Sequence, residues 1–133
     1  MNSICIFGVF VADLCFFGDK IPVKGETVLG NNHIVGPGGK GSNQAIAAAR
    51  LNGNVNFITK VGNDNHADMA FSLYKEAGVN VDYVIRDPSL STGVAGIMID
   101  EKGNNAINVF AGAAKHLNNN DIDKNLEIFK KSK

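Results

Sequence analysis

The chain is short of several residue types and of net charge. Among its 133 residues there is no tryptophan, there are only two cysteines and three prolines, and 13 Lys and Arg residues balance 13 Asp and Glu residues. This neutral balance, without a basic stripe, argues against nucleic acid or an anionic membrane as the main partner. The length is that of one domain with one core, and the composition suits a small neutral ligand.

The two cysteines give no sign of a disulfide framework or a metal site. Cys5 and Cys15 each lie within or next to an apolar run, and no spacing of Cys and His residues resembles that of metal ligands. We predict that both are reduced thiols in the core. Residues 1–17 are apolar, but they lack a positively charged start and include Asp13, so they match neither a signal peptide nor a membrane span. We therefore expect a cytoplasmic protein.

The most informative segment is residues 36–49, GPGGKGSNQAIAAA, in which a glycine run opens directly onto an alanine-rich stretch. Glycines let the backbone approach a ligand closely, and the first N–H groups of a helix are unpaired and lie at the positive end of the helix dipole. The segment therefore predicts a helix start that binds hydroxyls or anionic groups. The alternative is an ordinary glycine-rich loop that only begins a helix.

The order of apolar runs predicts an α/β fold. Residues 3–10 and 55–61 are rich in β-branched and aromatic residues without alternation, which is typical of strands covered on both faces. Between them, the glycine run leads into a helix that we predict over about 43–52, ended by Gly53.

Further elements are expected along the rest of the chain. They are a helix over 65–77 capped by Asp64 or Asn65, a strand over 79–85, a hairpin of 93–99 and 106–110, and a final amphipathic helix that starts at 118–120 and carries Ile122, Leu126 and Phe129. An α/β unit normally continues from such a helix to another parallel strand, and so few strands leave a sheet edge uncovered. We therefore expect the N-terminal portion of something larger.

Two nucleotide-binding motifs are alternative interpretations of the glycine run. A Walker P-loop fails at Lys40, because Ile34 stands where its first glycine belongs and Gly41 follows the lysine. A dinucleotide fingerprint matches three glycines of the run, with Asp64 after the next strand. The first buried strand lies too far upstream for that motif, however, and Lys40 would fill its tight turn. A nicotinamide site is therefore the less favoured alternative.

Five motifs in order along the chain resemble the N-terminal part of the PfkB carbohydrate kinase family and, within it, the ribokinases. They are Gly-x-x-x-x-Asp at 8–13, Pro-x-x-Gly-Glu-Thr at 22–27, the first family signature at 38–45, and the segments 91–95 and 111–113. The resemblance implies a ribokinase-like parallel-sheet core with a small β-sheet lid, truncated at the C-terminus. Residues 1–133 would then be the N-terminal portion of one domain, with lid segments at about 14–35 and 91–110.

The same resemblance implies transfer of the γ-phosphate of ATP to the 5-hydroxyl of D-ribose, with the sugar bound in this part. Asp13 would accept hydrogen bonds from two sugar hydroxyls, each worth roughly 1.5–3 kcal/mol because the acceptor is charged. Gly39 and Lys40 would donate to the sugar, and Asn43 can donate and accept. The structural alternatives are that Asp13 caps a loop, that Asn43 caps the helix, and that Lys40 is only solvated.

The resemblance also implies that the lid covers the sugar, excludes water and pairs subunits into a homodimer. Five apolar residues are candidates for covering the sugar or for the dimer contact, although core packing would explain each of them as well: Phe16, Phe17, Ile97, Ile99 and Val109.

Two residues depart from the ribokinase pattern. Val11 stands two residues before the motif aspartate, where ribokinases usually carry Asn, and Ala114 follows Gly-Ala at a position where Asn is common. The loss of a hydrogen bond from the first position changes affinity by about 0.5–1.5 kcal/mol. That change would weaken ribose binding or shift the preference toward another sugar or a nucleoside.

The second family signature, Asp-Thr-x-Gly-Ala-Gly-Asp, does not occur in the chain. In the family it supplies the catalytic base and an anion hole. The resemblance therefore places the sites for ATP, Mg²⁺ and a possible monovalent cation in a missing C-terminal part, and we expect no phosphorylation by this chain alone. The alternative function is a non-catalytic fragment that binds sugar or dimerises.

Overall fold

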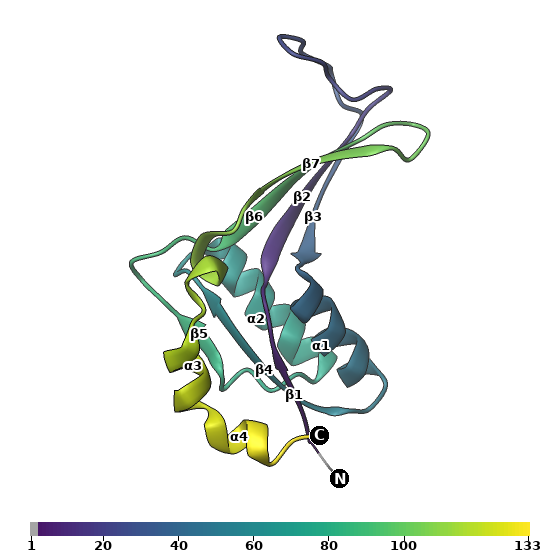
Figure 1. The fold of residues 1–133 in the computed structure, drawn as a ribbon. Helices are drawn as coiled ribbons and strands as arrows, with labels where there is room; N and C mark the ends of the chain where they lie inside the picture. Colours follow the sequence, from purple (N-terminus) through teal and green to yellow (C-terminus); the bar gives the residue numbers. More distant parts are fainter. Residues whose placement is uncertain (1–2) are drawn as a thin grey trace.

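The computed structural model describes residues 3–133, which form two separate β-sheets (Figure 1). The first is a parallel three-stranded sheet in the order β1-β4-β5, made of Ser3–Phe7, Asn54–Val61 and Val84–Arg86. The second has four strands in the order β3-β2-β6-β7, made of Asn32–Gly38, Val11–Phe17, Gly93–Ile99 and Asn105–Phe110. Figure 1 shows the second sheet projecting away from the first, as expected for a core with a lid.

Two helices cover one face of the parallel sheet and enclose the main core. They are α1, Lys40–Arg50, and α2, Asn65–Ala77. Alternate residues of β4 point to them, and Phe57 there is fully buried. The ring of Tyr74 from α2 meets Phe57 and Phe10 edge to face, with ring centres 5.3 and 6.1 Å apart.

The C-terminal segment covers the other face of the parallel sheet. It consists of the 3₁₀ helix η1, Gly112–His116, and the short helices α3, Asn119–Lys124, and α4, Leu126–Lys130. Lys60 of β4 is buried and its Nζ lies 3.0 Å from the Asp121 carboxylate and 2.9 Å from the His116 carbonyl. The Phe7 and Phe129 rings lie 6.3 Å apart. A charged pair and an aromatic contact therefore hold this segment against the sheet.

Most sequence-based elements are confirmed, and the differences have local causes. The helix over 65–77 is confirmed, with Asp64 as its cap, since the Asp64 carboxylate accepts the Ala67 N–H at 3.0 Å. The strand predicted over 3–10 ends at Phe7, because the chain leaves the parallel sheet there and continues as β2 of the second sheet. The helix predicted from residue 43 already begins at Lys40.

Two of the later predictions were wrong in length. The strand predicted over 79–85 is reduced to Val84–Arg86, with a single bridge from Asn80 to Asn56 before it. The final helix is two helices, because Asn125 between them has a φ of −111° and its side-chain amide donates to the Asp121 carbonyl at 2.7 Å. This side-chain bond to the backbone competes with continuous helix.

In the second sheet, β2 pairs antiparallel with β3 and parallel with β6, and β6 pairs antiparallel with β7. Side chains alternate between its faces, so the register assigns each residue to a face. The face that carries Asp13, called the Asp13 face below, also carries Val11, Cys15 and Phe17 of β2; Asn32, Ile34, Gly36 and Gly38 of β3; Gly93, Ala95, Ile97 and Ile99 of β6; and Asn105, Ile107 and Val109 of β7.

Both cysteines are free, but the prediction that they lie in the core was wrong. Cys5 and Cys15 are each only half-buried. Burial raises the pKa of both thiols, and the negative charge of Asp13 raises that of Cys15 further. The thiols are therefore protonated at neutral pH. None of the helices described is both long enough and apolar enough to cross a membrane.

Candidate functional site

Asp13 lies in β2, where the second sheet meets the core. Its register partners are Gly36 in β3 and Ala95 in β6. A Cβ atom at Gly38 would overlap the Asp13 carboxylate, so the carboxylate rests directly on the glycine backbone. The glycine run therefore makes room for the aspartate, which places the two motifs, 25 residues apart in the chain, at one site.

The Asp13 carboxylate is half-buried, and no hydrogen bond donated to it is found within residues 3–133. Burial raises its pKa above the usual 3.8. An ionised carboxylate without donors is costly for the fold, because it has lost part of its hydration and gained no partner. Such a carboxylate is free to accept hydrogen bonds from a ligand. It does not cap a loop, which removes the structural alternative for this residue.

Gly39 connects the second sheet to α1 in a backbone conformation with φ of 92°, which favours glycine. It is the N-cap of α1 and offers no side chain to the N–H groups of the first turn. Of these groups, the Ser42 N–H donates to the Val9 carbonyl at 3.3 Å. Lys40 is the first residue of the helix and its side chain is exposed, as the solvated alternative requires. The helix start next to Asp13 can therefore donate to a ligand.

Asn43 lies one turn further along α1 and is exposed. It is not the helix cap, since that position belongs to Gly39. Its side chain borders a hollow of about 250 Å³ shared with Pro37, Ile46, Ala47, Arg50 and Leu73. Within the described part of the chain no hydrogen bond joins Asn43 to Asp13. The structure thus places the Asp13 carboxylate against Gly38, directly before Gly39 and Lys40 in the chain, and gives no contact between Asp13 and Asn43.

One contact behind the site was missed by sequence reasoning. The Tyr74 hydroxyl of α2 donates to the Ser42 Oγ of α1 at 2.9 Å, or accepts from it, and both residues are fully buried. Burial raises the pKa of Tyr74. This bond ties the first turn of α1 to α2 behind the glycine run. Ser42 is part of the glycine motif, but nothing in the spacing of the sequence identifies its partner.

The five apolar residues expected on the lid divide between its two faces. Four of them lie on the Asp13 face: Phe17, Ile97, Ile99 and Val109. Phe16 lies on the opposite face and is 44% exposed, and Val109 is 55% exposed. The other three are half-buried. A sugar cover next to Asp13 therefore suits only the residues on the Asp13 face.

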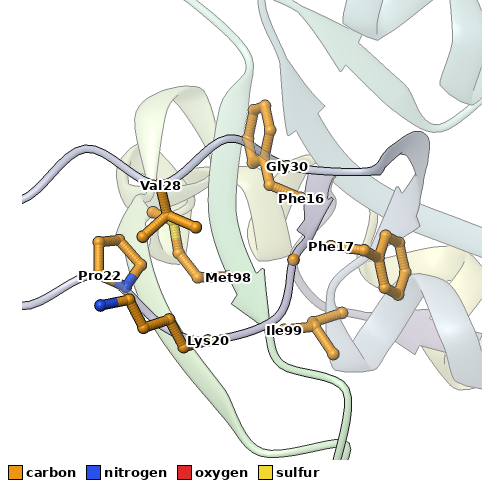
Figure 2. A pocket seen from close by; sticks show the side chains of 9 residues that line it. Phe16, Phe17, Lys20, Pro22, Val28, Gly30, Met98 and Ile99 are labelled. Atoms are coloured by element: carbon orange, nitrogen blue, oxygen red, sulfur yellow. The ribbon is translucent and has the colours of Figure 1, made fainter.

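A separate apolar pocket lies at the far end of the second sheet (Figure 2). It measures about 170 Å³, and Figure 2 shows Val28, Pro22 and Met98 around it, with Lys20 as its charged side chain. Its remaining lining residues are Phe16, Phe17, Gly18, Gly30 and Ile99. No carboxylate and no amide side chain lines it. The lining of this pocket therefore offers no carboxylate or amide acceptor to a sugar hydroxyl.

The two departures from the ribokinase pattern are both buried. Val11 is 8% exposed and lies on the Asp13 face two residues before Asp13, and Ala114 is 5% exposed in η1. Among residues 3–133 no three His, Cys, Asp or Glu side chains come close enough to hold a metal ion.

Comparison with known proteins agrees with this architecture. The pfkB family carbohydrate kinase model matches residues 1–133. A deoxyribokinase from Salmonella typhi is 40% identical over 129 residues, which are 97% of this chain and 42% of the relative. A ribokinase from Bacillus subtilis is 42% identical over 113 residues, which are 85% of this chain and 38% of the relative.

A solved structure gives the same result for the fold. The ribokinase of Arabidopsis thaliana, complexed with ribose and ATP, matches 98% of this chain and 43% of its own with a TM-score of 0.86 and 30% identity. The chain thus spans about two fifths of the length of the relatives it matches. On the family match over residues 1–133, the chain belongs to the pfkB family of carbohydrate kinases.

Proposed function

We propose that this chain supplies the sugar-binding part of a kinase that transfers the γ-phosphate of ATP to the 5-hydroxyl of a pentose. The observation that carries the proposal is the half-buried Asp13 carboxylate, which has no donor within residues 3–133 and rests on Gly38 beside an uncapped helix start. A charged acceptor next to free N–H donors matches the hydroxyl pattern of a sugar.

The pentose we propose is D-ribose, as the resemblance to ribokinases implies. The names of the Bacillus subtilis and Arabidopsis thaliana relatives support this choice, and the name of the Salmonella typhi relative adds 2-deoxy-D-ribose as the second candidate. The Arabidopsis structure, complexed with ribose and ATP, also supports ATP as the phosphate donor.

The role of this chain in the reaction is to bind and orient the sugar. Asp13 accepts hydrogen bonds from sugar hydroxyls, Gly39 and Lys40 donate to the sugar, and Asn43 completes the set. With the sugar held, its 5-hydroxyl oxygen attacks the γ-phosphorus, the bond from that phosphorus to the bridging oxygen breaks, and ADP leaves. The hydroxyl proton passes to a base outside this chain. The sites for ATP, Mg²⁺ and a monovalent cation stay predictions for the rest of the enzyme, as do a homodimer through the lid and a cytoplasmic location.

The test is titration of the ¹⁵N-labelled chain with D-ribose and 2-deoxy-D-ribose, followed by NMR. We expect shifts of the Asp13, Gly39 and Lys40 amides that saturate with sugar, and no ADP release when ATP and sugar are both present. The absence of any sugar-dependent shift at these amides would refute the binding role. Ribose-dependent ADP release that disappears in Asp13→Ala would refute the assignment of the base to another part of the enzyme.

A further inference from the structure

The first turn of α1 is anchored by a single buried side chain. Of residues 40–43, only Ser42 is buried, while Lys40 and Asn43 are exposed and the fourth residue is a glycine. The N-cap Gly39 adds no side-chain bond to this turn. A helix that covers a sheet is usually held by apolar side chains that face the core. Here the anchor is a hydroxyl, so its hydrogen bond decides where the turn lies.

On its side toward β1, the turn rests on bare backbone. A Cβ atom at Gly41 would lie only 2.8 Å from the Cα atom of Gly8, and one at Gly39 would overlap the Val9 carbonyl. The hydrogen bond from the Ser42 N–H to the Val9 carbonyl is long, at 3.3 Å. Interlocking side chains normally fix how two elements pack, and two glycines supply none. This contact brings the turn close to the residues that follow β1 but does not fix its position along them.

Tyr74 of α2 holds the turn from a second side. Its hydroxyl and the Ser42 Oγ lie 2.9 Å apart, and both residues are fully buried. Burial raises the pKa of Tyr74, so the hydroxyl keeps its proton and stays able to donate. A Ser42 hydroxyl without this partner would have to bond a carbonyl of its own chain, which bends a helix. The bond between Tyr74 and Ser42 therefore fixes both the place and the direction of the helix start.

The ring of the same tyrosine contacts the segment that leads to Asp13. It meets Phe10 edge to face with ring centres 6.1 Å apart, and Phe57 of β4 with ring centres 5.3 Å apart. Phe10 is fully buried in the link between β1 and β2, three residues before Asp13. A ring packed between such partners has little freedom to move. The Tyr74 side chain thus connects the acceptor of the proposed sugar site to the helix start that carries the donors.

We propose that Tyr74 is a positioning residue of the sugar site, which acts through Ser42 to set the first turn of α1 relative to Asp13. The inference rests on the proposed function for the identity of the ligand. The pairing of β2 with β3 fixes the site only as far as Gly38, because the chain changes direction at Gly39, where φ is 92°. Beyond that residue the direction of the helix N–H groups depends on what holds the first turn. Tyr74 is buried behind this turn and does not itself touch the sugar.

Tyr74→Phe is the first test, since it removes the hydroxyl and keeps the ring. We expect its affinity for the pentose that the wild type binds more tightly to fall at least fivefold in an NMR titration, because a shifted turn no longer meets the sugar hydroxyls in line. Lower stability alone does not produce this change, since nearly all of the protein stays folded below its melting temperature. Asn80→Ala is the matched control, because it removes another side-chain bond of 2.9 Å, to Asn56 near the start of β4. The control should melt earlier than the wild type and bind the pentose equally well.

Ser42→Ala and the double variant Ser42→Ala/Tyr74→Phe complete a cycle. Because both partners act through one bond, the double variant should lose no more affinity than either single variant, whereas independent effects would multiply to about 25-fold. Its stability should recover, because two apolar groups in place of the hydroxyls leave no buried hydroxyl unpaired. Affinity that stays low while stability recovers identifies a positioning role. Affinity that returns together with stability would overturn the proposal.

Amide exchange tests the same point without sugar. In Tyr74→Phe, exchange should speed up at least tenfold more at Ser42, whose N–H bonds the Val9 carbonyl, than at Ala49 in the last turn of the same helix. Only the first turn has lost its anchor, so only that turn opens locally. Equal acceleration at both amides would mean a uniform loss of stability and would also overturn the proposal. Either single variant carries the test if the other does not fold.

The proposed function and the positioning role can fail separately. A wild-type chain that binds neither pentose would refute the proposed function. A wild-type chain that binds a pentose, with Tyr74→Phe binding it equally tightly, would refute only the positioning role of Tyr74.

Discussion

Replacement of Asp13 by asparagine separates binding from stability. The Asp13 carboxylate is half-buried and has no hydrogen-bond donor within residues 3–133, and burial raises its pKa. The charged carboxylate therefore destabilises the folded state until a ligand donates hydrogen bonds to it. Asp13→Asn keeps the size and shape of the side chain but removes the charge. We expect the variant to melt at a higher temperature than the wild type and to bind sugar much more weakly.

The magnitude of the binding loss follows from the bonds that Asp13 is proposed to accept. A hydroxyl bond to a charged acceptor is worth roughly 1.5–3 kcal/mol and one to a neutral amide about 0.5–1.5 kcal/mol. For two such bonds the loss of the charge therefore costs roughly 2–3 kcal/mol, or about 100-fold in affinity. NMR titration with D-ribose and 2-deoxy-D-ribose measures this change. Thermal unfolding followed by circular dichroism measures the stability.

The gain in stability depends on pH with a definite sign. Because the folded pKa of Asp13 lies above its usual 3.8, the ionised form destabilises the fold at all pH values above that raised pKa. The gain from Asp13→Asn is therefore full at neutral pH, shrinks as the pH falls through the raised pKa, and vanishes below 3.8. Sugar binding by the wild type falls through the same window, as the carboxylate takes up its proton.

Asp64→Asn is the control. The Asp64 carboxylate accepts the Ala67 N–H at 3.0 Å and the Thr92 N–H at 2.8 Å. Burial raises its pKa, but these hydrogen bonds outweigh burial and hold the pKa below its usual value. This variant should lose stability where Asp13→Asn gains it. A lower melting temperature for Asp13→Asn, or unchanged sugar affinity, would refute the reasoning that Asp13 is an acceptor held for a ligand.

Three further variants test other parts of the structure. Asp121→Ala leaves the Lys60 ammonium buried without its carboxylate and should cost about 3–5 kcal/mol in urea unfolding; an effect below 1 kcal/mol would show that water reaches Lys60. Thr59→Val removes a buried hydroxyl that has no partner in the described structure and should raise the unfolding free energy by about 1 kcal/mol, and a loss of stability would reveal an unseen partner. Val11→Asn adds a donor and an acceptor on the Asp13 face and should tighten D-ribose binding by about 0.5–1.5 kcal/mol in the same titration, whereas weaker binding would place the sugar away from Val11.

Local signals in the sequence were sufficient to predict most of the helices and strands and to indicate the family. The glycine run predicted a helix start, and the structure has α1 beginning there, at Lys40. Apolar spacing with a capping aspartate predicted the helix over 65–77, and the turn residues predicted the hairpin of β6 and β7. These features depend on neighbours within a few residues, so the sequence expresses them directly.

Prediction from the sequence was less reliable where the tertiary structure or a side-chain hydrogen bond overrides a local pattern. Residues 3–10 form one apolar run, yet the strand ends at Phe7 because the chain changes sheets after it. The final amphipathic pattern is continuous, yet the helix breaks at Asn125 because its side chain bonds the backbone of the preceding turn. Periodicity reports which residues share a face, but not what covers that face or where a neighbouring element ends.

The sequence by itself determined the fold class and the family: it indicated an α/β chain of the pfkB family. It also identified Asp13 and the glycine run as candidates for sugar binding. Only the tertiary structure decided how the parts meet. It rests the Asp13 carboxylate on Gly38, pairs Tyr74 with Ser42 and places Lys60 against Asp121. The physical reason is that each of these contacts joins residues 25 to 61 positions apart, and such contacts are selected by the packing of whole elements, which no local pattern encodes.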